Sequence, residues 1–152
     1  ASVTLTGIDS DDVYMVTANN VISVNDGTTI RAKVTVSGTE QTVSNYTRAN
    51  TELKANTSFG EEATTQAAFY LANAVGSATN EQANFILYLF NFNKSDEYSI
   101  ITNEVAHITS SGHLTGRQGG GVYTVNEAND GIHFFAGTGN IESGTFTLYK
   151  VV

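Results

Sequence analysis

Phe85-Ile-Leu-Tyr-Leu-Phe-Asn-Phe92 is the stretch of this 152-residue chain that decides the fold. In a strand, side chains alternate between two faces, and here both faces are apolar. One face would carry Phe85, Leu87 and Leu89, and the other Ile86, Tyr88, Phe90 and Phe92. An antiparallel strand with one face in water normally alternates apolar and polar residues. We therefore expect both faces to be covered by protein, within a sandwich or by a neighbouring subunit, and we favour a buried sandwich strand.

The segments around this stretch predict more strands separated by turns. The clearest strand places Ile30, Ala32, Val34 and Val36 on one face and Arg31, Lys33 and Thr35 on the other. Asn25-Asp26-Gly27 before it predicts a hairpin, because Asp-Gly tolerates the positive φ of tight turns. Further strands are expected at residues 3–5, 14–17, 21–24, 98–108, 122–125, 132–136 and 144–151. Many short strands with regular turn signals predict an all-β fold, a two-sheet antiparallel β-sandwich of jelly-roll type, as one domain over residues 1–152.

Three segments lack a clear strand pattern. Residues 37–62 are rich in Thr, Asn, Ser and Glu, and predict a long surface excursion with one short strand near residues 43–46. Long loops in compact domains are usually functional, so Tyr46, Leu53 and Phe59 are candidate partner contacts. Gly116-Arg-Gln-Gly-Gly-Gly121 predicts a flexible connector. Residues 63–75 could form a helix or a strand, and we favour a strand.

Composition restricts the classes of function. Hydrophobic residues make up 40% of the chain and charged residues only 14%, with a formal charge of −8. Such an acidic chain is repelled by phosphate backbones and anionic membrane surfaces, so we expect neither nucleic-acid nor membrane partners. Cysteine is absent, which excludes disulfides, zinc-thiolate sites and thiol nucleophiles. No signal peptide or membrane-spanning run is recognisable, and we expect a soluble protein.

Candidate chemical sites are weak. Asp9, Asp11 and Asp12 lack the glycine and the distal glutamate of a helix-loop-helix calcium loop, and we expect a solvated turn. His107, His113 and His133 have no metal-ligand spacing, and His133 is expected to be partly buried and hydrogen-bonded. Ser111-Gly112-His113 lacks a nucleophile elbow. No catalytic, cofactor or metal residue is therefore assigned.

Two C-terminal segments carry a resemblance to a known family. They are Phe85-Ile-Leu-Tyr-Leu-Phe-Asn-Phe-Asn-Lys-Ser95, followed by an Ile-containing strand after Tyr98, and Gly139-Asn-Ile-Glu-Ser-Gly-Thr-Phe-Thr-Leu-Tyr149. Residues 66–152 resemble a family of small virion proteins of tailed bacteriophages, whose chains end in a similar Gly-Ser/Thr-Phe-x-Leu-Tyr strand. The glycines at 116–121 depart from the family, which has a large aromatic residue there. The resemblance implies a β-sandwich module of the phage particle surface, made in the host cytoplasm and commonly trimeric or ring-forming.

Three functional hypotheses follow from the residues and the resemblance. The first is a non-enzymatic virion surface protein, a capsid decoration or tail-fibre module, that forms a homo-oligomer, a trimer in the favoured case, and contacts other virion proteins. Its expected assembly interface consists of Ile86, Tyr88, Phe90 and Phe92. The second is a carbohydrate-binding module that recognises a host surface glycan. The third, a β-sandwich hydrolase, ranks last because no convergent acid–base set can be named.

Overall fold

The computed structural model describes residues 1–55 and 59–152, with the side chains of residue 59 and residues 61–64 left outside the description. In these residues it contains twelve strands and no helix. The all-β prediction is confirmed. None of the described residues forms a helix with the length and hydrophobicity of a membrane span.

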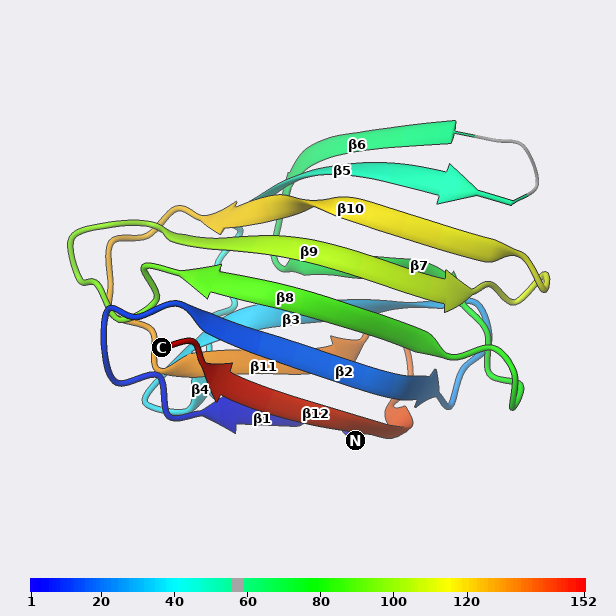
Figure 1. The fold of residues 1–152 in the computed structure, drawn as a ribbon, viewed down its shortest axis with the longest axis horizontal. Coiled ribbons are helices and arrows are strands. Elements are labelled where there is room, and N and C mark those ends of the chain that lie inside the picture. The colour runs from blue at the N-terminus through cyan, green and yellow to red at the C-terminus, as the bar shows by residue number, and fades with distance from the viewer. Residues whose placement is uncertain (56–58) are drawn as a thin grey trace.

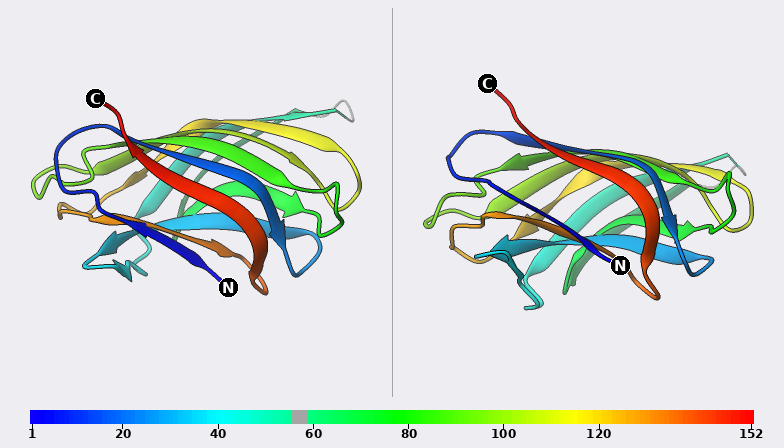
Figure 2. Two further views of the ribbon diagram at one scale, coloured as in Figure 1. Left: turned by 60° about the horizontal axis from the view of Figure 1, so that its bottom comes forward. Right: turned by 90° about the horizontal axis from the view of Figure 1, so that it is seen from below.

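The strands form two antiparallel sheets that pack face to face (Figures 1 and 2). Every pairing within them is antiparallel, so the predicted two-sheet antiparallel β-sandwich is confirmed. The large sheet has the order β12 (Ile141–Lys150), β2 (Tyr14–Ser23), β8 (Ala83–Phe90), β9 (Ser99–Ile108), β10 (Leu114–Tyr123), β5 (Tyr46–Lys54) and β6 (Phe59–Gln66). The small sheet has the order β1 (Val3–Thr6), β11 (Gly131–Ala136), β3 (Thr28–Val36) and β4 (Thr39–Glu40), with β7 (Phe69–Val75) also pairing with β3.

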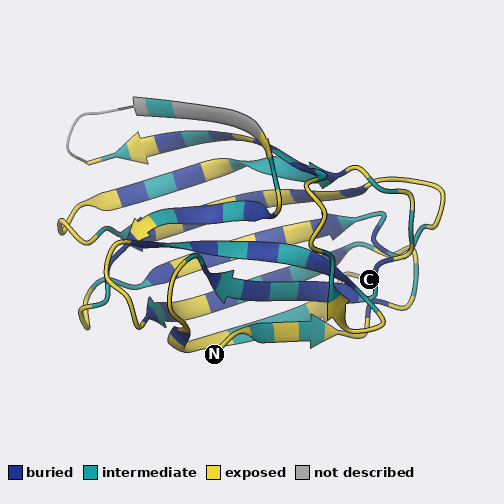
Figure 3. Cartoon of the chain, turned by 180° about the vertical axis from the view of Figure 1, so that it is seen from behind, coloured by how far each residue is buried: buried dark blue, intermediate teal, exposed yellow. Residues whose placement is uncertain are grey.

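The core lies between the inner faces of the two sheets. Val16 and Leu87 from the large sheet, and Ile30 and Phe134 from the small sheet, are completely buried. Strand β3 follows its predicted pattern, since Ile30, Ala32 and Val34 are buried while Arg31 and Lys33 are only partly covered on the opposite side. Figure 3 shows the burial of the chain from the side of the small sheet. Thr35 and Val36 reverse the pattern at the end of β3, where the hydroxyl of Thr35 donates to Asp130 at 2.7 Å.

Burial of both faces of β8 is a wrong prediction for the single chain. Phe85, Leu87 and Leu89 are buried, but Ile86 and Tyr88 are 40% and 41% exposed. The reason is that the sandwich has only two layers, so the second face of a central strand points outward. Phe92 lies beyond the strand and is 1% exposed, because Asn91 with φ of 60° interrupts the alternation. Phe92 therefore belongs to the core, and its assignment to an assembly interface is wrong.

The predicted surface excursion over residues 37–62 is also wrong. Half of it belongs to β5 and β6, which pair with each other, and β5 also pairs with β10, while residues 56–58 lie outside the described residues. Tyr46 is 1% exposed and packs against Phe69 and Tyr123, so it is a core residue and not a partner contact. Strand β5 was not recognisable because its inward positions after Tyr46 are the polar residues Arg48, Asn50 and Glu52.

The glycine-rich segment is a strand interior, which corrects the prediction of a flexible connector. Gly116 to Gly121 lie in β10, which pairs along this whole length with β9 and with β5. A Cβ atom at Gly120 would lie 2.7 Å from the carbonyl oxygen of Ile101, and one at Gly121 would lie 2.6 Å from Cδ1 of Phe69. Close approach of neighbouring atoms explains why these positions hold glycine.

The turn at Asn25-Asp26-Gly27 exists, with φ of 68° at Gly27, but it is not a hairpin. It connects β2 to β3, and these strands lie in different sheets. The two short strands expected at 14–17 and 21–24 form one strand, β2, whose register with β8 shifts between Ala18 and Val21. The preference for strand over helix at 63–75 is confirmed by the end of β6 and by β7.

Candidate functional site

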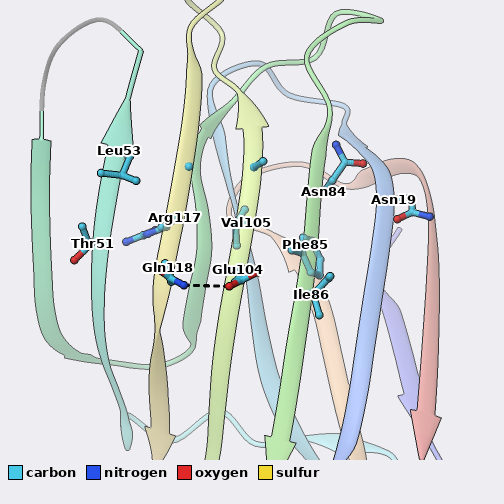
Figure 4. A pocket seen from close by; sticks show the side chains of 12 residues that line it. Asn19, Thr51, Leu53, Asn84, Phe85, Ile86, Glu104, Val105, Arg117 and Gln118 are labelled. Atoms are coloured by element: carbon cyan, nitrogen blue, oxygen red, sulfur yellow. Dashed lines mark hydrogen bonds between the residues drawn. The ribbon is translucent and has the colours of Figure 1, made fainter. Parts of the chain in front are cut away.

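The side chains that point outward from the central strands of the large sheet lie in rows that cross the strands. The register places Ile86 of β8 opposite Glu104 of β9, Glu104 opposite Gln118 of β10, and Gln118 opposite Thr51 of β5. This central row crosses four strands. We call the outward surface of β8, β9, β10 and β5 the outer face. In Figure 4 the central row is seen with the small sheet behind it.

Small residues in the two neighbouring rows leave hollows on both sides of the central row. One neighbouring row contains Ala106 and Gly116, and the other contains Thr102 and Gly120. The first hollow, of about 500 Å³, extends to Leu53, Asn84 and Asn19. The second, of about 450 Å³, extends to Tyr88 and Gly119. Ile86, Glu104 and Gln118 line both hollows, so the central row forms the boundary between them.

The outer face combines exposed apolar side chains with one polar pair. Ile86, Tyr88 and Ile100 are each about two-fifths exposed, and Leu53 is 59% exposed. The Nε2 atom of Gln118 donates a hydrogen bond of 3.0 Å to Oε1 of Glu104 (Figure 4). Large apolar side chains that are exposed together in a cluster mark interaction sites more often than single exposed ones do. Glu104 supplies the only full charge among the outward side chains of β8, β9 and β10.

The structure brings together residues that the sequence assigned to two separate surfaces. Ile86 and Tyr88 lie on the outer face as neighbouring outward positions of β8. Leu53, predicted as a loop contact, lies on the same outer face and lines the same hollow as Ile86. Phe90 is half-buried at the end of β8 opposite Ile100. The side chain of Phe59 lies outside the described residues, and Phe92 and Tyr46 are in the core.

A polar cluster lies behind β10, on the inner side of the large sheet. Glu52 Oε1 is 3.6 Å from Nε of Arg117, and Glu52 Oε2 is 3.1 Å from Nζ of Lys54. Asn73 of β7 donates to Glu52 at 3.2 Å, and its carbonyl oxygen accepts a hydrogen bond of 2.7 Å from Nε2 of His107. The cluster connects β5, β9 and β10 to β7.

Burial and pairing shift the pKa values of the cluster in opposite ways. Burial by itself would raise the pKa of Glu52, but the hydrogen bond from Lys54 and the charge of Arg117 outweigh it, so the pKa is lowered. Burial lowers the pKa of His107, although its hydrogen bond to Asn73 and the charge of Glu52 act against this effect. Glu52 is therefore ionised and His107 neutral at pH 7, with the Nε2 proton on the hydrogen bond to Asn73.

Sequence reasoning missed this cluster, although one signal was present. Arg48, Asn50 and Glu52 share the alternation of buried Tyr46, and His107 shares that of Val105. Polar residues at core-facing positions of a strand require partners in the interior. That rule would have grouped these residues, but the partners on β7 depend on how the two sheets stack.

The other candidate residues have ordinary structural partners. Asp9 accepts a hydrogen bond from Tyr14, and Asp12 is paired with Lys150 at 2.8 Å, so this turn is tied to two strands. His133 is hydrogen-bonded to Thr4 at 2.7 Å and mostly covered, as predicted. Ser111 and His113 line a hollow of about 290 Å³ that also includes Glu52, but no hydrogen bond joins the two among the described residues. In the same residues, no three acidic or histidine side chains are grouped to hold a metal ion.

No family model, curated protein or solved structure matches this chain. The outer face and the polar cluster are therefore the features from which a function can be inferred. The polar cluster acts as a link between the sheets, because Glu52, Arg117 and His107 are all buried and each interacts within the interior. The outer face differs, since its apolar groups and its Glu104–Gln118 pair are open to solvent and accessible to a partner.

Proposed function

We propose that this chain is a non-enzymatic structural module that associates with further copies of itself through the outer face. The observation that carries the proposal is the exposure of Ile86, Tyr88 and Ile100 on central strands of the large sheet. Its setting on the surface of a phage particle, as a capsid decoration or tail-fibre module in contact with other virion proteins, is supported by the resemblance of the C-terminal segments. A homotrimer is the oligomer that this resemblance favours.

The exposure of these side chains favours a protein partner. Covering a large apolar side chain contributes roughly 1.5–3 kcal/mol when burial is complete, and these residues retain about two-fifths of that surface. Several such groups lie side by side, since Tyr88 is next to Ile86 on β8 and Ile100 is opposite Phe90. Strands β8 and β9 are paired on both sides, so these apolar groups belong to the face of the sheet, and an apolar partner surface can cover them together.

Charge distribution favours a second copy as that partner. The chain carries a formal charge of −8, and most surfaces of two copies would repel each other. On β8, β9 and β10 the outer face carries one carboxylate, Glu104, which is hydrogen-bonded to Gln118. Two outer faces can therefore meet with little repulsion, and their apolar groups can cover one another.

The molecular mass of the protein in solution tests this proposal. Light scattering at micromolar concentration should give a multiple of 16.2 kDa, and the multiple distinguishes a trimer from a dimer. Ile86→Glu places a second carboxylate opposite Glu104 and should weaken association by about tenfold or more. Val43→Glu is the matched control, because Val43 is 46% exposed but lies between β4 and β5, away from the outer face.

A monomeric wild-type chain at this concentration would overturn the proposal. So would an oligomer whose dissociation is unchanged by Ile86→Glu while far-ultraviolet circular dichroism shows the variant to be folded. Equal weakening by Val43→Glu would also overturn it, because the effect would then come from net charge alone.

A second candidate function, carbohydrate binding, is favoured by the Glu104–Gln118 pair. A carboxylate and an amide between two hollows supply an acceptor and a donor for sugar hydroxyls, and the exposed ring of Tyr88 offers a surface for stacking. The host surface glycan is then the partner. Binding to a glycan array, with and without calcium, should be lost in Gln118→Ala. An array without any bound glycan would eliminate this candidate.

A further inference from the structure

The outer surface of the small sheet carries cations in a chain that is acidic overall. Arg31 and Lys33 occupy neighbouring outward positions on β3, and His133 of β11 is opposite Lys33. The ring of Tyr70 on β7 has the guanidinium carbons of both Arg31 and Arg48 at 4.1 Å from its centroid. Three of the seven Lys and Arg residues of the chain are therefore gathered around this part of the small sheet, which faces the viewer in Figure 3.

Arg31 is the cation that distinguishes this surface. Lys33, Lys54, Lys94, Arg117 and Lys150 each have a carboxylate oxygen within 3.6 Å. Arg31 has no such partner among the described residues. Its Nε atom donates to the hydroxyl of Thr29 at 2.7 Å, and its guanidinium carbon lies 4.1 Å from the centre of the Tyr70 ring. In a chain with fifteen acidic and seven basic residues, an arginine without a carboxylate partner is a position at which an anion from outside can bind.

The guanidinium of Arg31 is held in place before any ligand arrives. Thr29 fixes its Nε, and Tyr70 supports its flat face. Gly137 closes the other side, because a Cβ atom there would lie 3.0 Å from Nη2 of Arg31 and 2.2 Å from Oγ1 of Thr29. A side chain that is already ordered loses less conformational entropy when it binds a ligand.

A hollow of about 140 Å³ lies next to this group. It is lined by Arg31, Lys33, Tyr70 and Phe135, and by residues 66–68 at the end of β6. The ammonium of Lys33 lies 4.9 Å from the centre of the Phe135 ring and 3.0 Å from Glu40. Phe135 and the two alanines of residues 66–68 supply an apolar wall beside the two cations.

We propose that this hollow binds a small oxyanion, a carboxylate or a phosphate, carried on a ligand with an apolar or sugar-ring face. The unpaired N–H groups of Arg31 match the two oxygens of a carboxylate or two of a phosphate. Lys33 supplies the second positive charge, and Phe135 packs against the body of the ligand. The site lies on the small sheet, so it is independent of association through the outer face of the large sheet.

Ligand titrations followed by nuclear magnetic resonance test the site directly. Glucuronic acid and glycerol phosphate are the two anionic probes, and glucose is the neutral one, each added to the full 152-residue chain. Either anionic probe should shift the amide resonances of Arg31, Lys33 and Phe135 with a dissociation constant on the order of millimolar. Raising the salt concentration should weaken this binding. A response to glucuronic acid alone identifies the carboxylate as the preferred group, and a response to glycerol phosphate alone identifies the phosphate.

Substitutions test which side chains contribute to the affinity for the anionic probes. Arg31→Gln should weaken binding by about tenfold or more, and Arg31→Lys should have an intermediate effect because it keeps the charge but loses the planar pair of donors. Lys94→Gln is the control, since Lys94 lies on the turn after β8 and pairs with Glu97. If Arg31→Gln does not fold, Lys33→Gln gives the same test. Equal shifts with glucose, unchanged affinity in the folded variant, or no shift with either anion at about ten times the expected constant would overturn the proposal.

Discussion

His107 illustrates how a single ionisable residue can control stability in this sandwich. Its side chain is 1% exposed, and its Nε2 atom is satisfied by the carbonyl oxygen of Asn73. Its Nδ1 atom has no hydrogen-bond partner among the described residues. Glu52 and Arg117 are the charged groups that act on it, with opposite signs. Burial dominates, so a proton on His107 is more costly in the folded chain than in the unfolded chain.

The lowered pKa of His107 predicts a loss of stability in mild acid. In the unfolded chain a histidine binds its proton near pH 6.5, whereas folded His107 resists protonation until a lower pH. The unfolded state therefore binds more protons below about pH 6.5, and the free energy of unfolding falls as the pH drops through this window. Burial lowers the pKa of His133 as well, so it contributes in the same direction.

Replacement of His107 measures how much this residue contributes to the loss of stability in mild acid. His107→Gln keeps a nitrogen donor for Asn73 and removes the titration, so its stability should fall less than that of the wild type between about pH 7.5 and pH 5.5. Urea unfolding at both pH values measures the difference. An identical pH dependence in His107→Gln and wild type would contradict the assignment.

At the scale of one element, β10 is built around contacts that exclude side chains. Glycine in a strand normally weakens it, because it packs nothing and loses more entropy on folding. Here Gly120 faces the backbone of β9, and Gly121 lies against the ring of Phe69 from β7. The glycines therefore allow the two sheets to approach at this point, and on the outer face they leave room for the two hollows.

Two alanine substitutions in β10 test which glycines are required by close packing and which have room for a methyl group. Gly121→Ala places a methyl group 2.6 Å from Cδ1 of Phe69, whose ring is buried against Tyr46, and should destabilise the chain by about 1–3 kcal/mol. Gly116→Ala meets nothing closer than 3.9 Å, and its stability should change by less than about 1 kcal/mol. Urea unfolding of both variants tests the pair. Equal effects would show that β10 does not pack as described.

The elements that the sequence predicted are those whose alternation was unambiguous. In β3, apolar and polar residues alternate and the buried face follows directly. In β5 the inward residues are polar and in β10 they are interrupted by glycine, so both strands resembled loops. In β8 both faces are apolar, and the alternation cannot show which side lacks a covering layer. The failures at β5 and β10 share one cause, namely that inward polar residues and glycines depend on partners from distant strands, whereas the failure at β8 depends on the number of layers in the fold.

At the scale of the whole molecule, strand order decides which residues meet. Ile86 and Tyr88 could be placed on one surface from the sequence, because they are two residues apart on one strand. The addition of Leu53 to that surface required the order β8, β9, β10, β5, and the hollow beside Arg31 required β3 to lie between β7 and β11. Strands β8, β9 and β10 follow one another in the chain, but β5 lies far from β10 in sequence, and β7 and β11 lie far from β3, so these pairings do not follow from local pattern.

The connections between the ends of the chain bind the two sheets into one unit. Strand β1 pairs with β11 in the small sheet, and β12 pairs with β2 in the large sheet. The amino group of Ala1 donates to the carbonyl oxygen of Ile141 at 3.1 Å. Phe146 of β12 contacts Phe85 of the large sheet and Phe134 of the small sheet, with ring centres 6.0 and 5.1 Å away.

Because the strands at the two ends of the chain join the two sheets, we expect the sandwich to unfold as one cooperative unit. Near-ultraviolet circular dichroism, which reports the packing of Tyr46 and Tyr123, should give the same urea midpoint as far-ultraviolet circular dichroism, which reports the strands. Removal of residues 141–152 should abolish this transition, because the edge of β2 loses its partner and Phe85 and Phe134 lose Phe146. Phe146→Ala keeps β12 and should instead lower the midpoint, with a cost of about 2–4 kcal/mol, since Phe146 is only partly buried. Separate midpoints for the two signals, or a cooperative transition in the shortened chain, would mean that one sheet is stable without the other.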